Sequence, residues 1–253
     1  MSEVRRGRLL VGLLLCALAS AGCSGEGSDA GPREPVTASV PAVGAAGGLD
    51  PSSPLDGDAS PSLPGGDQGV VAVVGTGPVS TADDGPATVA VAVRNNTSTT
   101  ATNLTVTATS EDAQGVRSVG TSREVTPGDI APGQIGLALV VFPDDARPDP
   151  DVPVRATAAS PGGDSTRTTL DVSGAASAEG TVTGEATNPE NTAVRGPYAV
   201  YVYCFDEAGA LGVATSGSVQ AHGPTPPGRS VRFSVDLGDR LCPRFAVAVT
   251  ASL

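Results

Sequence analysis

An internal repeat of turn sequences constrains the fold of this chain more than any other feature. Four landmarks recur between the two halves at offsets of 92, 94, 95 and 90 residues: Asn96 with Asn188, Asp112-x-x-Gly115 with Asp206-x-x-Gly209, Pro132-Gly133 with Pro227-Gly228, and 153–160 with 243–250. Asp-x-x-Gly and Pro-Gly favour tight turns, so their constant spacing indicates that the backbone turns at matching places in both halves. The repeat predicts two tandem domains, one over residues 69–160 and one over residues 161–253.

Short runs rich in valine and threonine lie between these turns. Both residue types fit the pleated surface of a sheet, and no window shows a sustained helical period. Ten such runs cover residues 70–74, 88–93, 104–109, 135–142, 152–158, 167–172, 181–186, 198–205, 231–237 and 245–250. Many short strands separated by Gly and Pro predict an all-β fold made of two β-sandwiches.

The N-terminus has the architecture of a secretory signal peptide. Arg5, Arg6 and Arg8 form a positive n-region, and residues 9–19 form an apolar h-region that is too short to span a bilayer. Three small residues, 20–22, then lead to Cys23, an ending that resembles the lipobox of bacterial lipoproteins. This pattern predicts a lipoprotein signal peptide over residues 1–22. Cys23 is then expected to carry the lipid that holds the mature protein at the extracytoplasmic face of the cell membrane.

Residues 23–68 are rich in Gly, Pro, Ser, Ala and Asp and contain almost no large apolar side chains. Such a stretch buries too little apolar surface to offset the conformational entropy lost on ordering. We therefore expect a flexible linker between the lipid and the folded part of the chain.

The charge of the chain argues against a nucleic-acid partner. All 15 basic residues are arginines, and removing the signal peptide leaves 12 of them against 26 acidic residues, a net charge of −14. A protein with this charge repels phosphate backbones and anionic lipid surfaces. The lack of lysine beside abundant Ala, Gly, Pro and Val is typical of a GC-rich genome and indicates an actinobacterial source.

Besides Cys23, the mature chain keeps two cysteines, Cys204 and Cys242. In an oxidising compartment this pair is expected to form a disulfide. A metal-binding or redox pair is the alternative. Neither a CxxC spacing nor a histidine cluster accompanies the two residues, so the disulfide is the simpler interpretation.

Four segments of the second half, GTVTGEATNP, YAVYVYCFDEAGALGVA, PPGRSVRFSVDL and RFAVAVT, follow a rhythm of Gly-rich turn, Asn, paired strand, aromatic-Asp-x-x-Gly and Pro-Gly. This rhythm resembles the FxLYD-type domain of secreted bacterial and archaeal proteins over about 75 residues. The name-giving segment maps to residues 202–206, where Asp206 alone matches outright. The resemblance implies an Ig-like β-sandwich and brings no catalytic residues with it.

The strand expected over residues 198–205 alternates two sets of apolar side chains, which point to opposite faces of a sheet. One set is Val200, Val202 and Cys204, and the other is Tyr201, Tyr203 and Phe205. If the first set faces the sandwich core, the three aromatic side chains form a possible surface for a partner. Two alternatives stay open: residues 69–160 cover the aromatic side chains, or these side chains form the core themselves.

No catalytic residue, metal site or cofactor is expected. His222 is the one histidine, and it lies in a loop of a chain that lacks a GxSxG serine elbow. Asp144, Asp145, Asp149 and Asp151 share a Pro-rich loop whose spacing is not that of an EF-hand. A solvated acidic loop and a cation site both stay open there.

These features together predict a non-enzymatic, lipid-anchored protein of the cell envelope that binds or scaffolds a partner. The lipid provides contact with the membrane, and an envelope protein or a glycan is the expected further partner. An accessory or sensor subunit of an envelope enzyme or transporter complex is the alternative.

Overall fold

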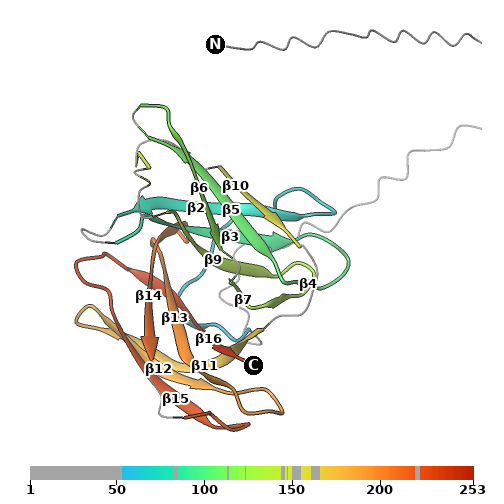
Figure 1. The fold of residues 1–253 in the computed structure, drawn as a ribbon, viewed down its shortest axis with the longest axis vertical. Coiled ribbons are helices and arrows are strands. Elements are labelled where there is room, and N and C mark those ends of the chain that lie inside the picture. Colours follow the sequence, from blue (N-terminus) through green and yellow to red (C-terminus); the bar gives the residue numbers. More distant parts are fainter. Residues whose placement is uncertain are drawn as a thin grey trace, which may run out of the picture. The chain divides into compact units, whose positions relative to one another are not determined.

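Antiparallel β-strands make up the fold, and the all-β prediction is confirmed (Figure 1). The computed structural model describes residues 53–253 apart from 82–84, 113, 123, 144–145, 147, 150–154, 161–165 and 220–222. In this described part there is no helix, and therefore none that could cross a membrane. Its strands are β1 (Asp56–Gly57), β2 (Val71–Ser80), β3 (Thr88–Asn95), β4 (Ala101–Thr102), β5 (Thr105–Glu111), β6 (Arg117–Ser122), β7 (Val125–Thr126), β8 (Asp129–Ile130), β9 (Ile135–Val141), β10 (Arg155–Ala159), β11 (Arg167–Ala178), β12 (Thr181–Thr187), β13 (Arg195–Phe205), β14 (Leu211–Val219), β15 (Ser230–Asp236) and β16 (Arg244–Ser252).

The strands pair into two large sheets and one small one. The first large sheet has the order β10-β5-β6-β9-β3-β2, with β7 added to β9, and the second has the order β14-β13-β16-β11-β12-β15, with β1 added to β16. Strands β4 and β8 form the small sheet. Apart from β1, the pairing follows the two halves of the sequence repeat. All described residues belong to one compact unit, so the number of independently folding domains stays a prediction.

Each half encloses a core of its own, because alternate side chains of its strands point inward. In the first half, Val91 of β3 packs in one cluster with Val106 of β5 and Val140 of β9. In the second half, Val200 of β13 packs in one cluster with Phe233 of β15. The face of β13 that carries Val200, Val202 and Cys204 therefore does face the sandwich core.

A third core joins the two halves. It forms because β3 and β9 in the first half and β13 and β16 in the second are apolar on both faces. Its members include Ala90, Ala92, Leu137 and Leu139 from the first half, and Tyr203, Phe205, Ala246 and Ala248 from the second. The backbones of β2 and β14 touch here, since a Cβ atom on Gly77 would lie 2.0 Å from the carbonyl oxygen of Gly212. We call this region the junction.

The hydrogen bonds confirm the repeat and shift one of its landmarks by a residue. The side-chain amide of Asn188 donates to the carbonyl oxygens of Thr192 and Thr225, and its carboxamide oxygen accepts from the Glu190 N–H group. Asn95, not Asn96, makes the same three bonds in the first half, to Thr99, Ile130 and Thr97. The predicted pairing of Asn96 with Asn188 is therefore wrong. The sequence alone does not show which of the two adjacent asparagines corresponds to Asn188. In the structure, burial of the Asn95 side chain identifies it.

Residues 53–67, which we call the strap, correct the prediction of a flexible linker over residues 23–68. Within the strap, β1 pairs with β16, with Asp56 opposite Val247. The side chains of Leu55 and Ala59 are buried in the junction core. The strap is therefore an integral part of the fold, and residues 23–52 of the predicted linker lie outside the described residues.

Polar contacts hold the strap to both halves of the chain. In the second half, the Asp58 carboxylate accepts the Phe245 N–H at 2.8 Å and pairs with Arg244 at 3.2 Å. In the first half, the side-chain amide of Asn96 donates to the carbonyl oxygens of Gly65 and Asp67. A segment of small and polar residues orders here because neighbouring strands satisfy its backbone groups, which composition alone does not reveal.

Candidate functional site at the junction

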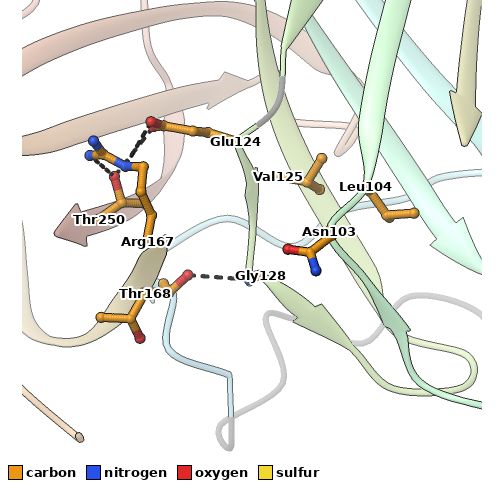
Figure 2. A pocket seen from close by; sticks show the side chains of 9 residues that line it. Asn103, Leu104, Glu124, Val125, Gly128, Arg167, Thr168 and Thr250 are labelled. Carbon is orange, nitrogen blue, oxygen red and sulfur yellow. Dashed lines mark hydrogen bonds and ion pairs between the residues drawn. The ribbon is translucent and has the colours of Figure 1, made fainter. Parts of the chain in front are cut away.

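A polar cluster at the edge of the junction brings together Glu124, Arg167, Tyr201 and Thr250, which we call the polar lock. Figure 2 shows the side chains of Glu124, Arg167 and Thr250 from this cluster. Glu124 directly precedes β7 in the first half. Arg167 opens β11, Tyr201 lies in β13, and Thr250 lies in β16, all in the second half. The lock therefore joins one carboxylate of the first half to three side chains of the second.

The geometry of the lock centres on the Glu124 carboxylate. Its Oε1 atom lies 2.7 Å from Nε of Arg167. Its Oε2 atom accepts hydrogen bonds from the hydroxyl groups of Tyr201 and Thr250. Nη2 of Arg167 also donates to Oγ1 of Thr250 at 2.7 Å, which closes the cluster. Since every contact of the carboxylate is with a donor, the arrangement suits a structural ion pair that fixes the two halves to each other.

A small hollow lies beside the lock and measures about 40 Å³. It is lined by Asn103, Leu104, Glu124, Val125, Gly128, Arg167, Thr168, Thr169 and Thr250. Across it, the Gly128 N–H group donates to Oγ1 of Thr169 at 3.2 Å. A hollow of this size has space for a few water molecules, and its polar lining offers them partners.

The aromatic side chains predicted as a possible partner surface lie in the junction. Tyr203 and Phe205 are 0% and 1% exposed, in contact with residues of the first half. Tyr201 is half-buried, and its hydroxyl belongs to the polar lock. The interpretation in which residues 69–160 cover the aromatic side chains is therefore the one the structure shows. The prediction of an open partner surface at Tyr203 and Phe205 is wrong, because the apolar outer faces of β3 and β9 cover these two side chains.

The predicted disulfide between Cys204 and Cys242 is present, with Cα atoms 4.9 Å apart. Cys204 is buried at the end of β13, and Cys242 packs against the core of the second half. The bond ties the loop before β16 to β13, and so braces the two strands that also carry the junction core.

Several residues singled out in the sequence lie outside the described residues, namely Cys23, Asp144, Asp145, Asp151 and His222. Asp149 is described, and its N–H group donates to the carbonyl oxygen of Glu111 at 3.1 Å. Among the described residues, no group of three or more His, Cys, Asp or Glu side chains is placed to hold a metal ion.

Sequence reasoning missed the polar lock. Glu124 and Arg167 each stand alone in their sequence context, and their pairing leaves no periodic pattern along the chain. Tyr201 was singled out for its ring rather than for its hydroxyl. One signal was available. If the other half of the repeat covers the outer face of β13, a tyrosine on that face needs a polar partner for its hydroxyl.

No family model matches this chain, and a search of the curated proteins finds no match.

Alkaline pH should destabilise the junction through Tyr203. Burial raises the pKa of Tyr203 well above its ordinary value of about 10, and an interaction with Thr126 offsets only part of this rise. In the unfolded chain the Tyr203 hydroxyl ionises above a pH of about 10, whereas in the folded chain it keeps its proton. The stabilisation is therefore complete below that pH and is lost as the pH rises above it. We expect Tyr203 to add about 1.4 kcal/mol per pH unit to the fall in the free energy of unfolding.

Urea unfolding at several pH values between about 9 and 11 measures this slope. The Tyr203→Phe variant keeps the ring and has no group to ionise, so its stability should decline less steeply than that of the native chain. Equal slopes for the two proteins would contradict the assignment of the alkaline loss to Tyr203.

Proposed function

We propose that the protein is a lipid-anchored, non-enzymatic module of the cell envelope that binds or scaffolds a partner on a rigid body made of two sandwiches. The observation that carries this proposal is the junction. A shared apolar core, the strap and the polar lock all join the same two halves. A body whose halves are fixed to each other can present a binding surface in a constant orientation.

The disulfide supports placement outside the cytoplasm. Disulfides persist in oxidising compartments and are rare where thiols are kept reduced. The Cys204–Cys242 bond therefore agrees with export through a signal peptide over residues 1–22. A lipid on Cys23 then keeps the exported chain at the membrane, and a diacylglyceryl group gives the two acyl chains that stable attachment requires.

We also infer that each half is an Ig-like sandwich of the FxLYD type. The same turns recur with the same hydrogen bonds in both halves. The Gly115 N–H group donates to the Asp112 carbonyl oxygen, just as Gly209 donates to Asp206. The Gly133 N–H group donates to Asn95, just as Gly228 donates to Asn188. Such recurrence supports one ancestral sandwich repeated in tandem.

Replacing the predicted lipid acceptor tests the proposed location. In the native host, Cys23→Ala should move the protein from the membrane fraction to the soluble exported fraction and should abolish labelling by a radioactive fatty acid. The folded part should be unchanged, because Cys23 is remote in sequence from both sandwiches. Retention of the strand-rich circular dichroism spectrum and of the Cys204–Cys242 bond checks this.

Cys16→Ala serves as the matched control, since it removes a cysteine from the apolar region of the signal peptide and leaves the acceptor in place. This variant should stay lipidated and in the membrane fraction. The proposal fails if Cys23→Ala remains membrane-bound to the same extent as Cys16→Ala.

A further inference from the structure

The strap is held to the rest of the described chain, which we call the body, by few contacts. Its strand β1 pairs with β16 at two positions, whereas β2, the next strand along the chain, pairs with β3 at seven. Its apolar contribution is also small, since Leu55 and Ala59 are buried and Leu63 packs partly buried against the junction core. Elements with few buried apolar contacts open at a lower free energy than the core strands of the same protein.

The polar contacts of the strap follow one another along its length. Among the described residues, and besides the β1 ladder, five amide hydrogen bonds join it to the second half: from Val172 to the Pro54 carbonyl oxygen, from Ala175 to the Asp56 carboxylate, from Phe245 to the Asp58 carboxylate, from Ala59 to the Phe245 carbonyl oxygen, and from Ser62 to the Gly209 carbonyl oxygen. The predicted lipid on Cys23 lies on the N-terminal side of all of them. A pull from the membrane therefore loads these bonds in turn, beginning at Pro54. Bonds that are loaded singly yield at a lower force than bonds that share a load.

Glycines at the C-terminal end of the strap provide a hinge. Gly66 and Gly69 have φ angles of 75° and 79°, a conformation that glycine adopts readily and other residues rarely adopt. Beyond them, β2 begins at Val71 and belongs to the large sheet of the first half. The strap can therefore turn away at these glycines while β2 keeps its place.

The body has its own means of holding the two halves together when the strap is absent. The residues of β16 that face β1, Ala246 and Val247, also pair with Tyr203 and Val202 of β13. The apolar side chains of β3, β9, β13 and β16 and the polar lock join the halves without the strap.

We propose that the strap is a releasable latch between the membrane anchor and the body. It leaves the body as one unit while both sandwiches stay folded, and tension on the lipid drives its release. Release frees fifteen residues, 53–67, which span about 50 Å when extended, so the body moves away from the membrane without unfolding. It also uncovers the edge of β16 at Ala246 and Val247. The role of tension rests on the lipid anchor of the proposed function, whereas release as a unit does not.

Native-state amide exchange, followed by NMR on the mature Cys23→Ala chain in low urea, tests release as a unit. Five amides lie at the contact, two in the strap and three in the body: Ala59, Ser62, Val172, Ala175 and Phe245. All five should exchange through one common opening, at least about tenfold faster than the hydrogen-bonded amides of the central strands β3 and β13. The proposal is overturned if the three body amides stay protected after the two strap amides have exchanged, or if all five exchange only with global unfolding.

Gly57→Val and Gly65→Val form a matched pair for the same measurement. Gly57 has a φ angle of 135°, and a Cβ atom there would lie 2.2 Å from the Phe245 carbonyl oxygen, so valine prevents docking of β1. Gly65 lies in the same segment, and no atom of the described residues lies within 4 Å of a Cβ atom placed there.

Gly57→Val should speed exchange of the five amides roughly tenfold or more and should leave β3 and β13 protected, whereas Gly65→Val should match the native chain. Loss of protection throughout the Gly57→Val chain would mean that the sandwiches need the strap, which overturns the proposal.

Optical tweezers test the role of tension on the same chain, with handles on peptide tags at its two ends. The C-terminal handle pulls on β16, whose last residues pair with β11 and β13 on either side and therefore resist. The native chain should show a first, reversible lengthening of less than about 50 Å, at a lower force than the unfolding of the sandwiches. This lengthening should be absent in Gly57→Val and unchanged in Gly65→Val.

A native chain without this early lengthening, or a Gly57→Val chain that keeps it, overturns the proposal. Neither measurement involves the lipid. Failure of the latch is therefore distinguished from failure of lipidation, which the fractionation of Cys23→Ala decides separately.

Discussion

Leu55→Ala should destabilise the protein by about 2–4 kcal/mol, although its position lies in a stretch whose composition is that of a linker. The Leu55 side chain is 7% exposed and packs in the junction core with residues of both halves. Truncation leaves a cavity that the junction cannot close, because β1 is held against β16 by backbone pairing. In a flexible linker, the same change would cost nothing. Equilibrium unfolding in urea, followed by circular dichroism, measures the difference.

Leu241→Ala is the matched control for this prediction. It is the same substitution at a side chain that is 88% exposed, so its cost should stay below about 0.5 kcal/mol. If Leu55→Ala proved as mild as Leu241→Ala, the strap would not be part of the stable fold, and the linker prediction would hold for residues 53–67 after all.

Removing the disulfide should cost about 4 kcal/mol, on the chain-entropy account of a crosslink. Cys204 and Cys242 are 38 residues apart in the sequence, so the bond removes a large loop from the freedom of the unfolded chain. The double variant Cys204→Ala, Cys242→Ala avoids leaving a free thiol, and alanine suits the buried position of Cys204. Urea unfolding of the oxidised native chain and of the double variant gives the difference.

A reducing agent provides the control for this second prediction. Dithiothreitol should lower the unfolding midpoint of the native chain to near that of the double variant and should leave the variant itself unchanged. A native midpoint that does not respond to full reduction would mean that the bond contributes little, and that the junction and the two inner cores carry the stability of β13 and β16.

Local pattern predicted most of the strands because their chemistry is local. Each of the ten predicted runs overlaps a strand of the structure, since Val and Thr alternation marks a half-buried strand wherever it occurs. Two longer strands were missed, β6 and β14, whose sequences RSVGTS and LGVATSGSV are rich in Gly and Ser. These residues have low strand propensity, and tertiary pairing with β5 and β13 overrides it.

The junction was beyond the reach of sequence reasoning for a different reason. The two apolar faces of β13 were visible in the alternation of its side chains, but which surface covers each face depends on how the halves meet. The strap illustrates the same limit. Its few apolar residues, among them Leu55 and Ala59, matter because they pack in the junction core, between two sheets whose strands come from distant parts of the sequence.

The faces that meet at the junction come from different positions in the repeat. Strands β3 and β9 of the first half correspond to β12 and β15 of the second, yet they pack on β13 and β16. The contact is thus head-to-tail, the kind of contact that continues into a filament unless something ends it. Both ends of this stack are polar, with Thr107, Thr121 and Thr157 on one and Thr183, Glu185 and Arg232 on the other. Those outer faces lack the apolar side chains that another contact of this kind would bury.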